Sequence, residues 1–350
     1  MSNLLYIFCI SLIIISQPVN STGKFIDKQA TNDDVSTKTV PSKSVLLRAI
    51  GGLGNQLFKF ACSYSLAKKH RRPLFVYVPF IENNPENRSF AANDRQFVLD
   101  YFHVDRYATM IDETWKFATT KPTNIPDDNL LSQDYNSSAP IFQHVDYCQS
   151  QAFFAPFKNH VVDAFQIKIE LLQSSTVSKW IHQINSTPVS VAVHIRHGDF
   201  SPMIRIPTIF YQKAVKDMIA KLAPVKPTFF IFTDEFNRRL LQQEFDFLFN
   251  ADKITTHVVS NPTSTNSLQE FYLMSSCRHQ IIPNSSFGWW AAYLNRNKDK
   301  IVIAAHHNPR LFDALHGRDS KVALYHRLQY RYLYYPQEWF VSDLFNETVF

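Results

Sequence analysis

The sequence predicts an α/β protein built from two halves, each with a parallel β-sheet. Three observations support this: short apolar runs alternate with segments of helical periodicity, a glycine loop follows the first apolar run, and polar loops follow three apolar runs of the second half. Alternating strands and helices place successive strands in a parallel sheet. The pattern changes near residue 160, which predicts a first domain over 45–160 and a second over 161–350.

The first half begins with a strand, a tight loop, a helix and a second strand. Residues 45–50 (VLLRAI) are predicted to form the first strand, and the loop 51–54 holds three of the seven glycines. Residues 55–70 have apolar side chains at helical spacing and end in basic residues, which suit a helix C-terminus. Residues 74–78 form the next strand, an order typical of a doubly wound domain. Residues 80–160 lack clear periodicity and are predicted to form helices and loops.

Strands and helices also alternate through the second half. Apolar side chains at helical spacing predict the helices, and short buried runs predict the strands. Predicted helices cover 161–172, 178–184, 210–222, 268–277 and 287–295, and predicted strands cover 189–195, 228–232, 280–282 and 301–305.

Composition excludes several classes of protein. With 45% hydrophobic and 19% charged residues, the 350-residue chain is globular and long enough to bury a large core. The 36 basic residues exceed the 30 acidic ones by 6, and no block of Lys or Arg forms the stripe that nucleic-acid binding needs. We therefore expect no nucleic-acid partner, and the small basic excess suits an anionic ligand such as a nucleotide phosphate.

The N-terminus predicts entry into the secretory pathway. Residues 4–15 (LLYIFCISLIII) are uncharged and apolar, and their length fits a signal-peptide core better than a membrane span of about 20 residues. We expect residues 1–21 to be a signal peptide or a short signal anchor, and the charged residues 22–44 to be a flexible stem. Glycosylation sequons support a lumenal or extracellular address and stand at Asn20, Asn87, Asn136, Asn185, Asn284 and Asn346.

Four cysteines limit the redox and metal chemistry. Cys9 lies in the N-terminal apolar run, so at most one intramolecular disulfide forms among Cys62, Cys148 and Cys277, and its pairing stays open. The sequence contains no Cys-x-x-Cys, no His-Glu-x-x-His and no Asp-x-Asp. We therefore expect no metal site.

Chemistry-bearing side chains follow three predicted strands of the second half. Residues 196–199 (RHGD) follow the first strand, 233–235 (TDE) the second and 283–288 (PNSSFG) the third. Ligands of open α/β sheets bind at the carboxyl ends of strands, so these loops share one edge if the strands are parallel neighbours. An arginine pairs with phosphate, a helix N-terminus binds a phosphate oxygen, and a carboxylate accepts hydrogen bonds from a base or ribose. This set suits a nucleoside diphosphate.

Each of these residues also has a structural explanation. Arg196 and Asp199 would form an ion pair, and Asp234 would cap a loop. The serines at the start of the last helix would be N-caps, and His194 would be a core histidine within its strand. The tryptophan pair 289–290 is predicted to pack rather than to stack on a base. The coincidence of three polar loops at strand ends favours the functional interpretation.

The glycine loop of the first half is the second candidate site. Residues 51–57 (GGLGNQL) hold the first two glycines of a dinucleotide-binding fingerprint, with Leu57 at the third position. An NAD(P)-linked oxidoreductase would use this loop, with Glu82 close to the ribose. Alternatively, the glycines let the backbone approach a ligand while Asn55 and Gln56 point their amides at it.

The candidate segments together resemble the α-1,2-fucosyltransferases, inverting enzymes that use GDP-fucose. The resemblance runs from about residue 45 to residue 308, and the order and spacing of the segments fit. The matching stretches are 51–60 (GGLGNQLFKF), 149–154 (QSQAFF), 194–199 (HIRHGD), 230–235 (FIFTDE) and 273–294 (LMSSCRHQIIPNSSFGWWAAYL).

Three positions depart from the family pattern. His197 replaces the second arginine of the family's His-x-Arg-Arg segment, and Glu235 replaces the second aspartate of its Asp-Asp pair. Ser267 stands where an acidic residue usually precedes the 268–277 helix. These departures concern the contacts to the nucleotide rather than the class of reaction.

The resemblance implies a GT-B-like fold, with two Rossmann-type domains facing a cleft and the donor on the C-terminal side. It also implies GDP-fucose as donor, a galactose-terminated glycan as acceptor, metal-independent transfer, and a type II Golgi membrane protein held by its N-terminal segment. If the signal is cleaved, the enzyme is secreted instead.

The resemblance also assigns roles to individual residues. Arg196 would neutralise the β-phosphate of GDP, and Asp199, or else His194, would be the general base for the acceptor hydroxyl. Donor-binding residues would be His194, Arg196, Thr233, Asp234, Asn284, Ser285, Ser286 and Phe287, and the opposite, acceptor-side wall would be formed by Gly52, Gly54, Asn55 and Gln56. Two alternatives remain, the oxidoreductase and a glycan-binding module that has lost turnover.

Overall fold

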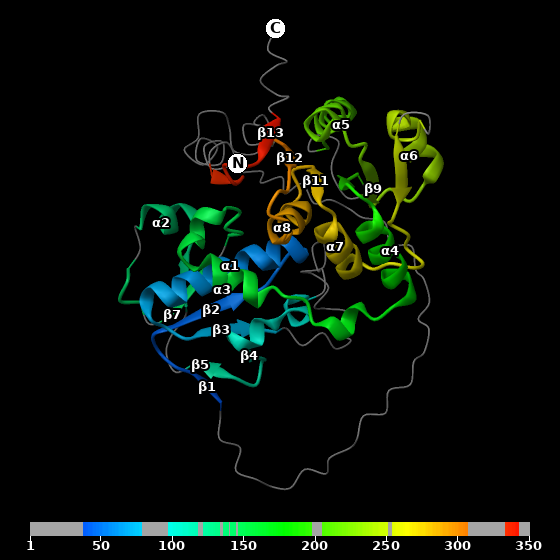
Figure 1. Cartoon of the computed structure of the whole chain (residues 1–350). Helices are drawn as coiled ribbons and strands as arrows, with labels where there is room; N and C mark the ends of the chain where they lie inside the picture. Colours follow the sequence, from blue (N-terminus) through cyan, green and yellow to red (C-terminus); the bar gives the residue numbers. More distant parts are fainter. Residues whose placement is uncertain are drawn as a thin grey trace, which may run out of the picture.

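Two parallel β-sheets form the framework of the molecule in the computed structural model (Figure 1). The strand order is β4-β3-β2-β7-β6 in the first sheet and β10-β9-β8-β11-β12-β13 in the second. Every pair of adjacent strands in both sheets is parallel, which confirms the predicted fold class. The structure describes residues 38–78, 97–117, 122–133, 136–139, 141–144, 146–197, 205–250, 254–306 and 333–342.

The first half contains a five-stranded sheet and the long helix α1. The expected strand–helix–strand unit is present, and a short pair of strands, β1 and β5, lies beside the sheet. The strands are β1 (Thr39–Val40), β2 (Ser44–Arg48), β3 (Leu74–Tyr77), β4 (Thr109–Ile111), β5 (Lys116–Phe117), β6 (Thr123–Ile125) and β7 (Ile141–His144), and the helices are α1 (Leu53–His70) and α2 (Asp127–Ser132). Short 3₁₀ helices cover Leu99–Tyr101, His103–Arg106, Gln151–Phe153 and Ala155–Phe157.

Two expectations for the first half are corrected. Residues 80–160, expected to be helices and loops, contribute three strands of the sheet, each of only three or four residues. A strand this short has too few positions to show an alternating pattern, so the sequence hides it. The folded part also begins before residue 45, where the stem was expected to end, because Val40 is fully buried in a small apolar cluster on the outer face of this sheet.

The second half contains a six-stranded sheet with helices on both faces. The strands are β8 (Ser190–Ile195), β9 (Thr228–Thr233), β10 (Thr255–Val258), β11 (His279–Ile282), β12 (Val302–Ala305) and β13 (Phe340–Ser342). The helices are α4 (Ser175–Ser186), α5 (Thr208–Leu222), α6 (Arg238–Glu244), α7 (Ser267–Ser276) and α8 (Ser286–Leu294), with 3₁₀ helices at Ile169–Leu172 and Asp246–Leu248. Helix α3 (Lys158–Ala164) precedes them in the chain and packs against the first half, at the 3₁₀ helix His103–Arg106.

The central strand β8 explains why the sequence of this half contains short apolar runs. All six of its residues are buried, because helices cover both faces of the sheet. Val191 and Val193 face the cluster that includes α5, whereas Ala192 faces the cluster that includes α7 and α8. Numbered in chain order, the strands lie in the order 3-2-1-4-5-6, which is the Rossmann arrangement.

The two halves share one hydrophobic core. Helix α1 packs on the first sheet and against α8 of the second half, so α8 is buried on all sides (Figure 1). The Phe58 ring of α1 lies 4.6 Å from the Trp289 ring and 4.9 Å from the Trp290 ring, measured between centroids. The tryptophan pair therefore packs in the core, as predicted. The two parallel sheets confirm two Rossmann-type domains, and a cavity lined by both halves lies between them.

Candidate active site

The three polar loops of the second half meet at one edge of the sheet. Strands β9, β8 and β11 are adjacent and parallel, so the loops after them emerge side by side, as predicted. The strand order reverses between β8 and β11, and this switch point is where open α/β sheets bind ligands. A cavity of about 680 Å³ lies there, between the two halves. Its lining includes the predicted residues Gly52, Gly54, Asn55, His194, Arg196, Thr233, Asp234, Asn284, Ser285, Ser286 and Phe287.

Arg196 is held at the cavity wall by Asp234. The Nη1 atom of Arg196 lies 2.9 Å from Oδ2 of Asp234, and both side chains are one-fifth exposed. The other carboxylate oxygen, Oδ1, accepts a hydrogen bond of 2.7 Å from the backbone N–H of His197. Since Asp234 is fixed from two sides, the guanidinium has a defined position before any ligand binds.

His194 lies under the start of α8 and is almost fully buried. A Cβ atom on Gly288 would be 2.6 Å from its Nδ1 atom, so a glycine is required where the helix crosses the ring. Burial, assisted by the positive charge of Arg196, lowers the pKa of His194 to about 3. The imidazole is therefore neutral at physiological pH and a weak proton acceptor.

The N-termini of two helices open onto the cavity. Residues 52–54 at the start of α1 and 285–287 at the start of α8 line it, and neither helix has an acidic residue in its first turn. Within the described residues, the N-cap Ser285 makes no side-chain capping hydrogen bond, although the sequence allowed one. Both helix ends therefore present backbone N–H groups and positive dipole ends to the cavity, which is an anion-binding arrangement.

Gly54 allows these two helix ends to meet. A Cβ atom at this position would lie 2.3 Å from the carbonyl carbon of Ser286 and 2.6 Å from the backbone nitrogen of Phe287. Both are backbone atoms, which cannot rotate away as a side chain would. The second glycine of the loop is therefore required for the contact between α1 and α8.

Glu270 is a cavity carboxylate that the sequence analysis missed. It lies in the first turn of α7, one turn after Ser267, and both residues line the cavity. Its Oε2 accepts a 2.7 Å hydrogen bond from Ser260, and its Oε1 accepts a 2.8 Å bond from Thr265. Burial raises the pKa of Glu270 above its usual value. The capping box of Asn266 was the sequence signal, because it starts the helix at 267 and places 267 and 270 on one face.

The opposite wall is formed by the first half. Asn55 and Gln149 line the cavity, and the Nε2 of Gln149 donates a 2.8 Å hydrogen bond to the Oδ1 of Asn55. Tyr101 and Tyr147 also line the cavity. Gln56, expected to point at the ligand, is instead fully buried. It donates to the carbonyl of residue 51 at 2.8 Å and accepts from the N–H of residue 98 at 3.0 Å, so it braces the glycine loop.

Two of the departures from the family pattern lie away from the cavity. The His197 side chain is buried beside Phe245, with its Nδ1 atom 3.5 Å from Oε2 of Glu244. Glu235 accepts a hydrogen bond from the backbone of Asn237, outside the cavity lining. Asp199, the first choice for a general base, lies outside the described residues, and its role stays a prediction.

Other features complete the description of the site. Cys62 and Cys148 form a disulfide, and Cys277 is a free, buried thiol. In the part of the chain that the structure describes, no three His, Cys, Asp or Glu side chains converge as metal ligands. The described helices also include none of the length and apolarity needed to span a bilayer, and residues 4–15 lie outside that search.

Comparisons with known proteins identify similar chains. The model of the family described as glycosyl transferase family 11 matches residues 114–318. The O-antigen biosynthesis glycosyltransferase WbnK of Escherichia coli is 25% identical over 293 residues, which cover 73% of this chain and 91% of that protein. An alpha-1,2-colitosyltransferase of Escherichia coli is 24% identical over 279 residues, covering 74% and 90% of the two chains. The galactoside alpha-(1,2)-fucosyltransferase 2 of Oryctolagus cuniculus is 22% identical over 278 residues, covering 75% and 70%.

Proposed function

The chain belongs to glycosyl transferase family 11, and from this premise we propose that it transfers L-fucose from GDP-β-L-fucose to the 2-hydroxyl of a galactose residue. The transfer inverts the anomeric centre and forms an α-1,2 linkage. Two similar proteins are described as α-1,2-transferases, which supports this linkage. The observation that carries the proposal is that Arg196 and two open helix N-termini line one cavity.

The diphosphate of the donor is proposed to lie between Arg196 and the starts of α1 and α8. The guanidinium presents a planar set of donors that matches phosphate oxygens, and the helix ends add backbone N–H groups. Ser285, Ser286 and Phe287 carry the α8 side of this subsite. Charge on the departing GDP grows as the C1–O bond breaks, so these preorganised donors stabilise the transition state more than the ground state.

The guanine base is proposed to contact Glu270. Asp234 is already engaged by Arg196 and by the backbone at 197, which leaves Glu270 as the second carboxylate of the described lining. Each oxygen of Glu270 accepts one hydrogen bond from the protein, and a carboxylate oxygen has capacity for a second. The N1–H and N2–H groups of guanine are donors of matching spacing, so Glu270→Gln should weaken binding of GDP more than binding of ADP.

The bonds change in a single displacement. The C1–O bond of fucose breaks, and its electron pair moves to the β-phosphate oxygen of GDP. The galactose O2 attacks C1 from the opposite face, through an oxocarbenium-like state. Its proton passes to a base, for which Asp199 is our proposal. His194 is the second choice, because its ring is almost fully buried under the start of α8.

The direct test is incubation with GDP-fucose and an array of galactose-terminated acceptors, followed by linkage analysis of the product. Arg196→Lys should reduce kcat by about 10²–10³, because a point charge cannot replace a planar donor set at the leaving group. Wild-type turnover in Arg196→Lys would contradict the assignment. Activity that persists in excess EDTA is expected, since we propose no metal cofactor.

Neither alternative has a specific observation in its favour. Gly54, which suggested a dinucleotide fingerprint, is explained by the contact with Ser286. Thermal stabilisation by NAD(P) but not by GDP would revive the oxidoreductase, because a ligand that binds the native state raises its melting temperature. GDP binding without transfer to any acceptor would indicate an inactive glycan-binding module.

We propose that the enzyme works in the lumen of the secretory pathway, as a type II Golgi membrane protein or after cleavage of its signal. The Cys62–Cys148 disulfide supports an oxidising compartment. Fluorescence microscopy of the tagged full chain, with sequencing of the mature N-terminus, separates these two forms from each other and from a cytosolic location.

A further inference from the structure

The segment of residues 146–150, here called the cavity strap, follows β7 and lines the acceptor-side wall. The first sheet reverses its strand order between β2 and β7, so the glycine loop and the strap both leave its switch point. Residues that line the cavity alternate along the strap with residues that are fixed elsewhere. Tyr147 and Gln149 line the cavity. Residues 146, 148 and 150 are bonded to other parts of the molecule.

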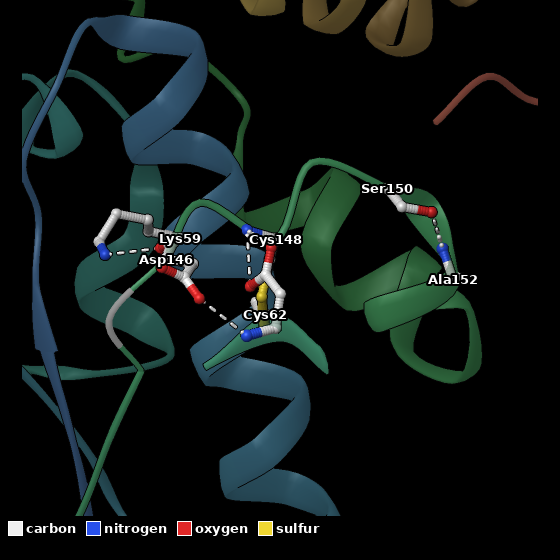
Figure 2. The surroundings of a disulfide bond; sticks show 7 residues. Lys59, Cys62, Asp146, Cys148, Ser150 and Ala152 are labelled. Carbon is white, nitrogen blue, oxygen red and sulfur yellow. Dashed lines mark hydrogen bonds between the residues drawn. A yellow bond between two sulfur atoms is a disulfide. The ribbon is translucent and has the colours of Figure 1, made fainter. Parts of the chain in front are cut away.

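Covalent and polar contacts fix the strap to neighbouring elements of the first half (Figure 2). Cys148 forms the disulfide to Cys62 of α1, across 86 residues of sequence. The backbone N–H of Cys148 donates to both carboxylate oxygens of Asp127, at 3.1 and 3.0 Å. The carbonyl of Asp146 accepts a 2.8 Å hydrogen bond from the Nζ of Lys59, a buried residue one turn before Cys62.

The backbone of the strap needs this support. Cys148 has φ of +50°, in the left-handed region that residues other than glycine rarely adopt. Cys148 is held in this conformation by its hydrogen bond to the carboxylate of Asp127 and by its disulfide to Cys62. A conformation of this kind persists when the surroundings over-determine it, and such positions cluster at ligand sites.

We propose that Tyr147, Gln149 and Asn55 form the acceptor-sugar subsite, and that the Cys62–Cys148 disulfide positions it. This inference rests on the proposed function. A hexose has an apolar C–H face and a rim of hydroxyls, and an aromatic ring beside two amides offers a partner for each. The amide pair Gln149–Asn55, bonded at 2.8 Å, stands on the wall that faces Arg196 and the donor loops. A galactose held there presents a hydroxyl to the side of fucose opposite to GDP.

The test separates acceptor binding from donor binding. Calorimetry measures the affinity of the full chain for GDP, and then the affinity of the GDP complex for N-acetyllactosamine. Three proteins are compared with wild type: Gln149→Leu, the double variant Cys62→Ala/Cys148→Ala, and the control Cys277→Ala. The control removes a thiol that is also buried but lies in the core at the end of α7, outside the cavity lining.

Gln149→Leu and the double variant are each expected to lose roughly tenfold in affinity for N-acetyllactosamine, which is the effect of one well-placed hydrogen bond. Their affinity for GDP should stay within about twofold, because neither variant removes a group proposed to contact GDP, and the start of α1 stays packed against Ser286 and braced by Gln56. The control should change neither affinity. Reducing the wild type with a phosphine should reproduce the double variant and should not change that variant further.

Three results overturn the inference. Unchanged acceptor affinity in Gln149→Leu removes the subsite, and unchanged acceptor affinity after reduction of the bridge removes its positioning role. Equal losses for GDP and N-acetyllactosamine indicate general damage instead. If the double variant fails to fold, Gln149→Leu still tests the subsite and the reduced wild type still tests the positioning role of the disulfide. A wild type that binds N-acetyllactosamine but not GDP refutes the proposed function while leaving the subsite standing.

Discussion

Replacing Gly54 by alanine tests whether the contact between the two helix N-termini builds the donor site. Gly54 lies in the first turn of α1, where intrinsic helix propensity favours alanine over glycine by about 1 kcal/mol. Packing predicts that the alanine variant is less stable instead. The new Cβ atom would be 2.3 Å from the carbonyl carbon of Ser286, about 1.1 Å closer than the 3.4 Å of an ordinary contact.

The steric cost exceeds the gain in propensity. Inserting a methyl group into a packed region costs typically 1–3 kcal/mol, and the upper part of that range applies because the clash is with backbone. After the propensity term is subtracted, we expect a net loss of about 2 kcal/mol. For a chain of this length, that loss corresponds to a fall in melting temperature of roughly 3 °C.

Function should suffer more than stability. Relief of the clash moves the starts of α1 and α8 apart by about 1 Å, and misplacement on that scale costs about 10²-fold in rate. Thermal melts with and without GDP, together with kcat/KM for GDP-fucose, measure both effects. A Gly54→Ala variant that melts at or above the wild-type temperature and keeps its GDP-induced stabilisation would refute the reasoning.

Three further predictions concern charge, pH and glycosylation. Asp234→Asn leaves the guanidinium of Arg196 without its carboxylate partner, and kcat/KM should fall about tenfold to hundredfold, which is the value of a charged hydrogen bond. Circular dichroism should show an unchanged fold, and full activity of the variant would exclude the positioning role of Asp234. The pKa of His194 is about 3 in the folded state and about 6.5 in the unfolded state, so the unfolded chain binds the extra proton and stability declines as pH falls below 6.5. Between pH 6.5 and 4.5 the loss of stability amounts to about 2 kcal/mol, which urea titrations should detect and His194→Gln should abolish. Asn136 and Asn185 are exposed, whereas Asn284 is 9% exposed and lines the cavity; peptide mapping of protein secreted from eukaryotic cells should therefore find glycans on the first two and none on the third.

Local pattern was sufficient for the second half of the fold. Strands β8 and β9 are almost fully buried, so apolar runs (VAV and FFIF) stand out in the sequence, and the shorter β11 (HQII) is marked by its final isoleucines. The loops after β8, β9 and β11 could be assigned to one edge because parallel strands share their carboxyl ends. The short strands β4, β6 and β7 could not be recognised, since their positions in the sheet are fixed by pairing with residues far away in sequence.

The sequence by itself determined the fold class, the family and the set of polar loops at one edge of the second sheet, because these depend on periodicity and on motifs along the chain. Only the tertiary structure decided which side chains share the cavity. It turned Gln56 inward, brought Glu270 and the strap residue Gln149 to opposite sides of the site, and paired Cys62 with Cys148. The physical reason is that these positions depend on how α1 packs against α8 and on where each sheet reverses its strand order. Both are long-range consequences of burying one core shared by two halves.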